Sequence, residues 1–255
     1  MTATKLPGYG ISSPCETNSK KFIGSTLLEA LESVFGVSKG KPRQVILGGH
    51  DRGARICHRL AVDKDDFSHL DIIGTVLLDI VPTKVQWEAF ANPLISCSYF
   101  HWPLLANVEI ATEMISAYGG ARWARGAHTR IAGASEVSAQ RIASDGAVDV
   151  YAELFDKRET LYYTCQDYAS GAAPEATEQA EDQKSGKKIT IPTLVMFSKA
   201  KLGARLDVAN IWKDWIHPGV QYQGIGVGNG YGHYLPEEAY DDVSDAIATF
   251  IKNVT

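Results

Sequence analysis

The segment LGGHDRGAR, at residues 47–55, constrains the fold more than any other part of the chain. It follows the short β-rich run RQVILGG and leads into GARICHRLAVD, which has helical spacing. A strand that turns into a helix through Gly-x-Asp-x-Gly presents its central side chain, Asp51, at the carboxyl end of the strand. Such a tight turn requires small neighbouring residues, here Gly49 and Gly53. The positive end of the helix dipole also favours a carboxylate at this position. The simpler alternative is that Asp51 only caps the helix.

Strand and helix patterns alternate on both sides of one long strandless region. Helices are predicted at 20–36, 53–63, near 206–216 and at 236–253, and strands at 43–49, 72–80, 192–198 and 220–227. This alternation predicts an α/β fold, a largely parallel sheet covered by helices on both faces. In the last helix, one apolar face is expected to carry Tyr240, Val243, Ile247 and Phe250.

The strandless region predicts an insertion. We expect residues 83–188 to form a helical cap between the two parts of the core, 1–82 and 189–255. The polar tract at 174–188 is expected to be an exposed connection. At 255 residues, the chain is long enough for one α/β domain with such an insertion.

Composition excludes several classes of partner. A net charge of -5 and a pI near 5.8 argue against nucleic acid and anionic membrane surfaces. No window of about 18 apolar residues predicts a membrane span, and the first residues lack the pattern of a signal peptide. The four cysteines lie far apart without metal-ligand spacing, so we expect reduced thiols in a cytoplasmic protein with no metal and no cofactor.

A nucleophile on such a turn requires a histidine and an orienting acid elsewhere in the chain. His233, in NGYGHYLPEEA, follows the last predicted strand and precedes the last helix. Asp79 and Asp207 are the candidate acids. We favour Asp79, because an acid at the end of the strand next to the one that leads into Asp51 points into the same crevice.

The turn around Asp51 and four later segments resemble motifs of one known group of enzymes. GGHDRGARICHRLAVD resembles the elbow of the α/β-hydrolase fold, in the aspartate-nucleophile branch of haloalkane dehalogenases, epoxide hydrolases and haloacetate (fluoroacetate) dehalogenases. Arg52 and Arg55, directly after the nucleophile and three positions on, are similar to the haloacetate group. The segments LLDIVPTKVQWEAF, YFHWPLLAN, TCQDYASGA and GHYLPEEA resemble further motifs of that group in the same order.

This resemblance implies haloacetate dehalogenase chemistry on a small-molecule substrate. Asp51 would displace halide from the α-carbon of a 2-haloacid and form an ester, because an ionised carboxylate needs no prior deprotonation. His233, held by Asp79, would activate the water that hydrolyses the ester. Arg52 and Arg55 would hold the carboxylate of the substrate in a fixed orientation.

The resemblance also implies three donors to the departing halide. They are His101, Trp102 and Tyr168. Donors aimed at the developing charge matter most for fluoride, which is a poor leaving group. Arg59, one turn beyond Arg55, is expected instead on a solvated helix face with salt bridges.

The part of this sequence that precedes the turn at Asp51 differs from the corresponding part in members of the group. Members of the group carry further strands and a His-Gly loop before the elbow, and that loop donates one N–H to the oxyanion hole. Without them the core is expected to be N-terminally shortened and only the N–H of Arg52 remains, so ester hydrolysis would be slower. The elbow strand would also lose a neighbour. Either the sequence is part of a longer chain, another subunit of a homodimer pairs the edge, or residues 1–18 cover it.

Two other functions stay open. The first is an epoxide hydrolase that uses the same residues, with Tyr163 and Tyr168 protonating the epoxide oxygen. The second is a catalytically impaired or repurposed homologue that binds a small carboxylate in the cap cavity. The reduced oxyanion hole motivates the second alternative.

Overall fold

The computed structural model describes residues 3–37 and 42–255. Its four strands are parallel and lie in the order in which they occur in the sequence, β1 (Arg43–His50), β2 (Leu70–Leu78), β3 (Thr193–Ser198) and β4 (Tyr222–Val227). Each matches a predicted strand. The register places His50 beside Leu78, Leu78 beside Met196 and Met196 beside Ile225. The carboxyl ends of the strands therefore meet along one edge of the sheet.

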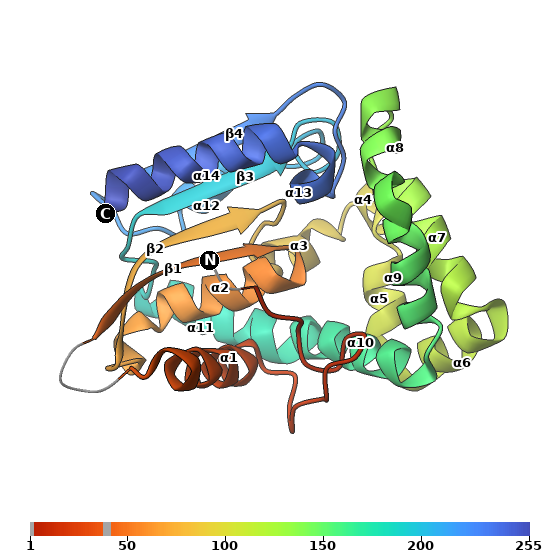
Figure 1. Ribbon diagram of the computed structural model, residues 1–255, viewed down its shortest axis with the longest axis horizontal. Helices are drawn as coiled ribbons and strands as arrows, with labels where there is room; N and C mark the ends of the chain where they lie inside the picture. The colour runs from red at the N-terminus through yellow and green to blue at the C-terminus, as the bar shows by residue number, and fades with distance from the viewer. Residues whose placement is uncertain (1–2, 38–41) are drawn as a thin grey trace.

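Helices cover both faces of this sheet, as predicted for an α/β fold (Figure 1). One face packs against α1 (Lys20–Phe35), α2 (Arg52–Val62) and α12 (Val208–Lys213), and the other against α13 (Leu235–Glu238) and α14 (Tyr240–Val254). Successive residues of β2 alternate between the two cores, because strand side chains point to opposite faces. Leu77 belongs to the first core, whereas Val76 and Leu78 belong to the second.

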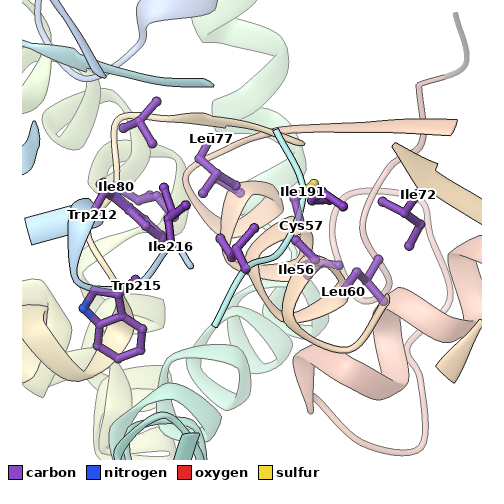
Figure 2. Packing of buried hydrophobic residues seen from close by; sticks show 14 of the residues in the cluster. Ile56, Cys57, Leu60, Ile72, Leu77, Ile80, Ile191, Trp212, Trp215 and Ile216 are labelled. Carbon is purple, nitrogen blue, oxygen red and sulfur yellow. The ribbon is translucent and has the colours of Figure 1, made fainter. Parts of the chain in front are cut away.

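The first core contains a fully buried tryptophan. Trp212 lies beside Ile80 and Ile216 (Figure 2) and belongs to the same buried cluster as Leu77 of β2 and Ile56 of α2. Its indole Nε1 donates a hydrogen bond to the carbonyl oxygen of Ile80 at 2.9 Å, so the polar atom of this side chain is satisfied. Ile80 directly follows Asp79, and this contact therefore fixes the chain just beyond the end of β2.

Residues 83–188, between β2 and β3, contain no strand and form the helical insertion. Its elements are α3 (Thr83–Ala89), α4 (Pro93–Ser98), α5 (His101–Ala106), α6 (Val108–Tyr118), α7 (Gly120–Ile131), α8 (Glu136–Ile142), α9 (Ala147–Phe155), α10 (Arg158–Ser170), a π-helical turn (Gly171–Glu175) and α11 (Ala176–Ser185). In Figure 1, α4 to α9 stand at the side of the sheet where its strands end. The division into core and cap domains remains a prediction.

The polar tract at 174–188 is not an exposed connection, and that prediction was wrong. It forms α11, whose Asp182 accepts a hydrogen bond from Arg59 of α2 at 2.6 Å. Gln179 accepts another from the backbone N–H of Lys84 at 2.9 Å. Arg59 does form salt bridges, as predicted, but it is 5% exposed rather than solvated. The polar composition of the tract partly reflects these contacts with α2 and α3.

The last helical pattern is interrupted. Ala239 adopts φ -128° and separates α13 from α14. Val243 and Phe250 are buried as predicted, and Ile247 packs beside them. Tyr240 instead is half-exposed and stacks with the guanidinium of Arg141 at 4.1 Å.

β1 lies at the edge of the sheet, as expected from the sequence. Within 3–37 and 42–255, no strand pairs with its outer side. Residues 3–18 run instead to α10, where the hydroxyl of Tyr9 donates to Asp167 at 2.8 Å and that of Ser170 to the carbonyl of Asn18 at 3.0 Å. Residues 3–18 therefore add no strand beside β1, although Leu6 and Cys15 pack against the first core, and residues 1–2 lie outside the described ranges. Pairing in a homodimer remains a prediction.

A helix that crosses a bilayer must be both long and predominantly apolar. Within the described ranges, none combines the length and the apolar composition that crossing a bilayer requires.

Candidate active site

Asp51 stands on a strained turn between β1 and α2. Its φ of 46° and ψ of -113° lie outside the regions that a non-glycine residue normally adopts, which costs about 1–3 kcal/mol. Its side chain makes no capping hydrogen bond to α2, so the capping alternative is not observed. A Cβ at Gly49 would collide with the backbone of Gly53, whereas a Cβ at Gly53 would meet nothing within 4 Å. Of the two glycines, only Gly49 is required by the packing.

The imidazole of His233 lies between two carboxylates. Its Nε2 is 3.6 Å from Oδ2 of Asp51, and its Nδ1 donates to Oδ2 of Asp79 at 2.7 Å. The other oxygen of Asp79 accepts the backbone N–H of Ser198 at 2.7 Å. Asp207 instead accepts a backbone hydrogen bond at the start of α12. Of the two candidate acids, the structure therefore places Asp79 beside the histidine.

This arrangement shifts the pKa of His233 and of Asp51. Burial works against protonation of His233, but its hydrogen bonds and charge interactions with Asp51 and Asp79 outweigh burial and raise its pKa to about 10. Burial would likewise raise the pKa of Asp51, but the histidine and then Arg52 hold it well below its usual range. At neutral pH the free protein therefore carries an ionised Asp51 and a protonated His233.

His50, which is not among the predicted site residues, contacts both the ring and the backbone of His233. The two rings have centroids 4.7 Å apart, and Nε2 of His50 donates to the backbone carbonyl of His233 at 2.7 Å. Burial, followed by the charge of His233, lowers the pKa of His50 to about 4, so this ring is neutral. Its position directly before Asp51 was the available signal in the sequence.

A cavity of about 460 Å³ opens in front of these residues. It lies between the carboxyl ends of the strands and the helical insertion. Asp51 and His233 line it, together with Arg55 and the three predicted halide donors, His101, Trp102 and Tyr168. The structure thus collects most of the predicted site residues around one space.

Arg55 reaches this cavity and is held firmly. Its Nη1 donates to the carbonyl of Val81 at 3.2 Å and to the hydroxyl of Thr83 at 3.0 Å, and its guanidinium lies 4.6 Å from the ring centre of Trp102. Burial, and then the nearby charge of Arg52, lowers the pKa of Arg55 to about 10. The side chain remains cationic at neutral pH and can bind an anionic group.

Arg52 departs from its predicted role. Its Nε binds Oδ2 of Asp167 at 2.5 Å and its Nη2 donates to the carbonyl of Asp167 at 2.8 Å, and it is not among the residues that line the cavity. The guanidinium fork is therefore occupied by the insertion rather than directed at substrate. Of the predicted pair, Arg55 alone lines the space in front of Asp51.

Asp167 is the centre of a buried ion network that the sequence analysis missed. Besides Arg52, it pairs with Lys20 at 2.5 Å and accepts from the hydroxyl of Tyr9 at 2.8 Å, and Lys20 also pairs with Glu175 at 2.6 Å. Burial opposes ionisation, but Arg52 and Lys20 hold the pKa of Asp167 well below its usual range. An acid directly before the predicted halide contact Tyr168 was the available signal.

The three predicted halide donors form one wall of the cavity. The ring of Tyr168 lies 5.5 Å from that of Trp102 and 6.1 Å from that of His101, measured between centroids. Burial, and then the charge of Arg130, lowers the pKa of His101 to about 4, whereas burial raises the pKa of Tyr168. At neutral pH the imidazole is therefore neutral and the phenol keeps its proton. The tyrosine O–H and one imidazole N–H are available as donors.

The tyrosines of the epoxide hydrolase alternative are only partly in place. Tyr163 packs against Gly8 and does not line the cavity. Tyr168 does, and Tyr234, beside His233, is a second tyrosine on the same cavity.

Across the described ranges, no three His, Cys, Asp or Glu side chains are grouped as metal ligands.

Comparison with known proteins relates the chain to hydrolases. No protein-family profile matches it. It is 23% identical over 214 residues to a fluoroacetate dehalogenase from Burkholderia sp, and the match covers 81% of this chain and 63% of that protein. The chain thus spans less than two thirds of the length of this relative.

Two solved structures are similar over nearly the whole chain. A candidate α/β hydrolase from Nostoc sp PCC 7120 gives a TM-score of 0.80 at 26% identity, covering 98% of this chain and 80% of that one. A variant of a candidate epoxide hydrolase from Pseudomonas aeruginosa gives a TM-score of 0.81 at 25% identity, covering 98% and 78%. These likenesses confirm the predicted fold class, the α/β-hydrolase fold.

Proposed function

Since the chain belongs to the α/β-hydrolase superfamily, we propose that it is a hydrolase that removes halide from 2-haloacids through an aspartyl ester. One observation carries the proposal: His233 stands between Asp51 and Asp79 beside a cavity that also contains a buried arginine. A carboxylate nucleophile suits attack at a saturated carbon. A cationic anchor in the same cavity suits a substrate that carries a carboxylate.

The first step is displacement at the carbon that bears the halogen. One oxygen of Asp51 attacks this carbon, a carbon–oxygen bond forms and the carbon–halogen bond breaks. Arg55 holds the substrate carboxylate and aligns the carbon for in-line attack. The halide leaves with its bonding electron pair toward His101, Trp102 and Tyr168, whose N–H and O–H groups stabilise its charge.

The second step hydrolyses the ester. His233 takes a proton from water, and the resulting hydroxide adds to the carboxyl carbon of Asp51. The ester carbon–oxygen bond breaks, the departing alkoxide takes the proton from His233, and the 2-hydroxyacid leaves. The Asp51 carboxyl group then passes its proton to His233, which restores the ionised carboxylate and the protonated histidine of the free protein. The backbone N–H of Arg52 is the donor that we assign to the oxyanion.

The first step also prepares the base for the second. A histidine with a pKa of about 10 is protonated at neutral pH and cannot accept a proton from water. Ester formation removes the negative charge of Asp51, one of the two carboxylates that raise this pKa. The pKa of His233 then falls and the imidazolium releases its proton to solvent, so alkylation of Asp51 itself converts the histidine into a base.

Halide release tests the proposal directly. Incubation with fluoroacetate or chloroacetate is expected to release halide and glycolate, and Asp51→Asn is expected to abolish the release. If neither a short nor a longer 2-haloacid releases halide in the presence of the native chain, dehalogenation is excluded.

An epoxide hydrolase is the second candidate, favoured by Tyr168 and Tyr234 on the same cavity as Asp51. Their hydroxyls would protonate the epoxide oxygen as Asp51 opens the ring. Conversion of styrene oxide to its diol, without turnover of 2-haloacids, would select this function. Tight binding of a carboxylate that is unchanged in Asp51→Asn and His233→Ala, without turnover of either substrate class, would indicate a non-catalytic homologue.

A further inference from the structure

The cavity is larger than a two-carbon haloacid requires. Its volume of about 460 Å³ falls within the range of about 300–1,000 Å³ that is typical of pockets for drug-sized ligands. A haloacetate bound between Asp51 and Arg55 would leave most of this space to water. The walls of the remaining space therefore carry information on the rest of the substrate.

Those walls are aromatic and cationic. The aromatic lining residues include Tyr99, Phe100, Trp123 and Phe155. The cationic ones, besides Arg55, are Arg130, Lys201 and Arg205, which we call the mouth cluster. Arg130 and Arg205 are exposed and Lys201 is half-buried, whereas Arg55 at the inner end is 4% exposed. The cavity thus has a cation at its buried end and three at its open end.

The mouth cluster is an organised group rather than three independent surface residues. Nζ of Lys201 donates to the backbone carbonyl of Arg130 at 3.1 Å, and Nη1 of Arg205 donates to the carbonyl of Lys201 at 3.2 Å. The two guanidinium groups lie over aromatic wall residues, Arg130 over Phe100 at 4.9 Å and Arg205 over Tyr99 at 5.4 Å. α7 and the loop after β3 therefore bring these charges together at one place.

No carboxylate in the described part of the chain neutralises this cluster. None of its three cations forms a salt bridge there, although Arg125 of α7 pairs with Asp149 and Arg141 pairs with Asp241. Among the described lining residues, the carboxylates are Asp51 and Asp79, both committed to His233. Like charges held close together repel one another, and an anion bound between them relieves the repulsion.

We propose that the mouth cluster is a second anion-binding subsite and that the substrate is a 2-haloacid with an apolar chain ending in a second anionic group, such as a carboxylate. This inference rests on the proposed function, because it places the first carboxylate at Arg55 and the reacting carbon at Asp51. The apolar chain packs against the aromatic wall. The terminal anion reaches Arg130, Arg205 and Lys201.

Paired substrates test the subsite. Each 2-bromo diacid, from 2-bromosuccinate to 2-bromosuberate, is compared with the 2-bromo monoacid of the same chain length. At the best length we expect kcat/KM to favour the diacid by about tenfold or more, as one charge-assisted hydrogen bond supplies. In the double variant Arg130→Gln and Arg205→Gln the ratio of diacid to monoacid should fall to about one.

Arg122→Gln is the matched control. Arg122 lies on the same helix as Arg130, is exposed, stacks on Tyr118 and does not line the cavity. Its loss changes the net charge equally, so the diacid preference should persist. Absence of a preference at every length, or a preference that survives the double variant, would overturn the subsite while leaving dehalogenation in place.

Binding separates the two proposals. If no 2-haloacid is turned over, the proposed function fails, and calorimetry with halogen-free diacids and monoacids of matched length then decides the subsite alone. Tighter binding of the diacid to the native chain, lost in the double variant but kept in Arg122→Gln, supports it. Equal binding of diacid and monoacid refutes it.

Discussion

Arg52 and Asp167, which are separated by 115 positions in the sequence, form a buried two-point contact through Nε and Nη2 of the arginine. Asp167 comes from α10 of the helical insertion, whereas Arg52 is the first residue of α2 and directly follows Asp51. The insertion is thereby fastened to the turn that carries Asp51. This contact replaces the predicted grip of Arg52 on the substrate.

Removing the charge of Asp167 should destabilise the protein strongly. Asp167→Asn leaves Arg52 and Lys20 buried with less compensation, and breaking a buried pair by removing one partner costs about 3–5 kcal/mol. Urea unfolding measures the change. Asp149→Asn removes an exposed partner of Arg125 and should have little effect. Equal stability of the two variants would show that the network contributes little.

The two glycines of the elbow should respond differently to alanine. Gly49→Ala places a Cβ against the backbone of Gly53 and is expected to cost about 3 kcal/mol or more. Gly53→Ala has room for its Cβ within α2 and should leave stability unchanged or raise it by up to about 1 kcal/mol. Thermal and urea unfolding of both variants provide the comparison, and similar losses would contradict this account of the turn.

The ester should accumulate when its hydrolysis is blocked. His233→Gln removes the base of the second step but keeps Asp51, so chloroacetate should carboxymethylate the protein once. Intact-mass spectrometry should detect the adduct, and peptide mapping should place it at Asp51. The variant Asp51→Asn should show no adduct. Modification at another residue would contradict the assignment of the nucleophile.

The protonation of His233 should depend on Asp51. In the native protein its pKa is raised to about 10, so the ion pair with Asp51 contributes stability fully below the ordinary histidine pKa and loses it as pH rises through about 10. In Asp51→Asn one of the two carboxylates is neutral, and the pKa should fall. Nuclear magnetic resonance titration of labelled histidines follows this change. An unchanged pKa would remove the coupling between the two proposed steps.

Arg55 should discriminate substrates by charge. Arg55→Gln is expected to lower kcat/KM for chloroacetate by about 10- to 100-fold, the loss expected for a hydrogen bond to a charged group. Chloroacetamide, which lacks the negative charge, provides the control and should lose much less. Halide release measures both. Equal losses would indicate that Arg55 acts through packing against Trp102 and Thr83 rather than on the carboxylate.

The sequence predicted the elements that have strong periodic or turn signals. All four strands, α1 and α2 follow from apolar patterns, and Asp51, His233 and Asp79 follow from their places at the ends of strands. In a parallel sheet, strand ends converge on one edge, so sequence position alone brings such residues together.

The departures involve long-range charge pairing. Arg52 pairs with Asp167, and Arg59 is buried against Asp182. Both contacts depend on how α10 and α11 pack against α2. Apolar periodicity carries no record of such pairs, because a buried ion-paired helix has the same polar composition as an exposed one. The break at Ala239 is likewise invisible in a pattern that continues through it.

Tyr9 and Lys20 both converge on Asp167, and Asp167 in turn holds the arginine beside the nucleophile. The segment from Tyr9 to Lys20 is thus bound at both ends to Asp167 of the insertion. A single proteolytic cut in this segment should therefore disturb the turn that carries Asp51, although no residue of the segment lines the cavity in front of Asp51. Limited digestion here is expected to lower the proposed activity even though the cut lies outside the cavity.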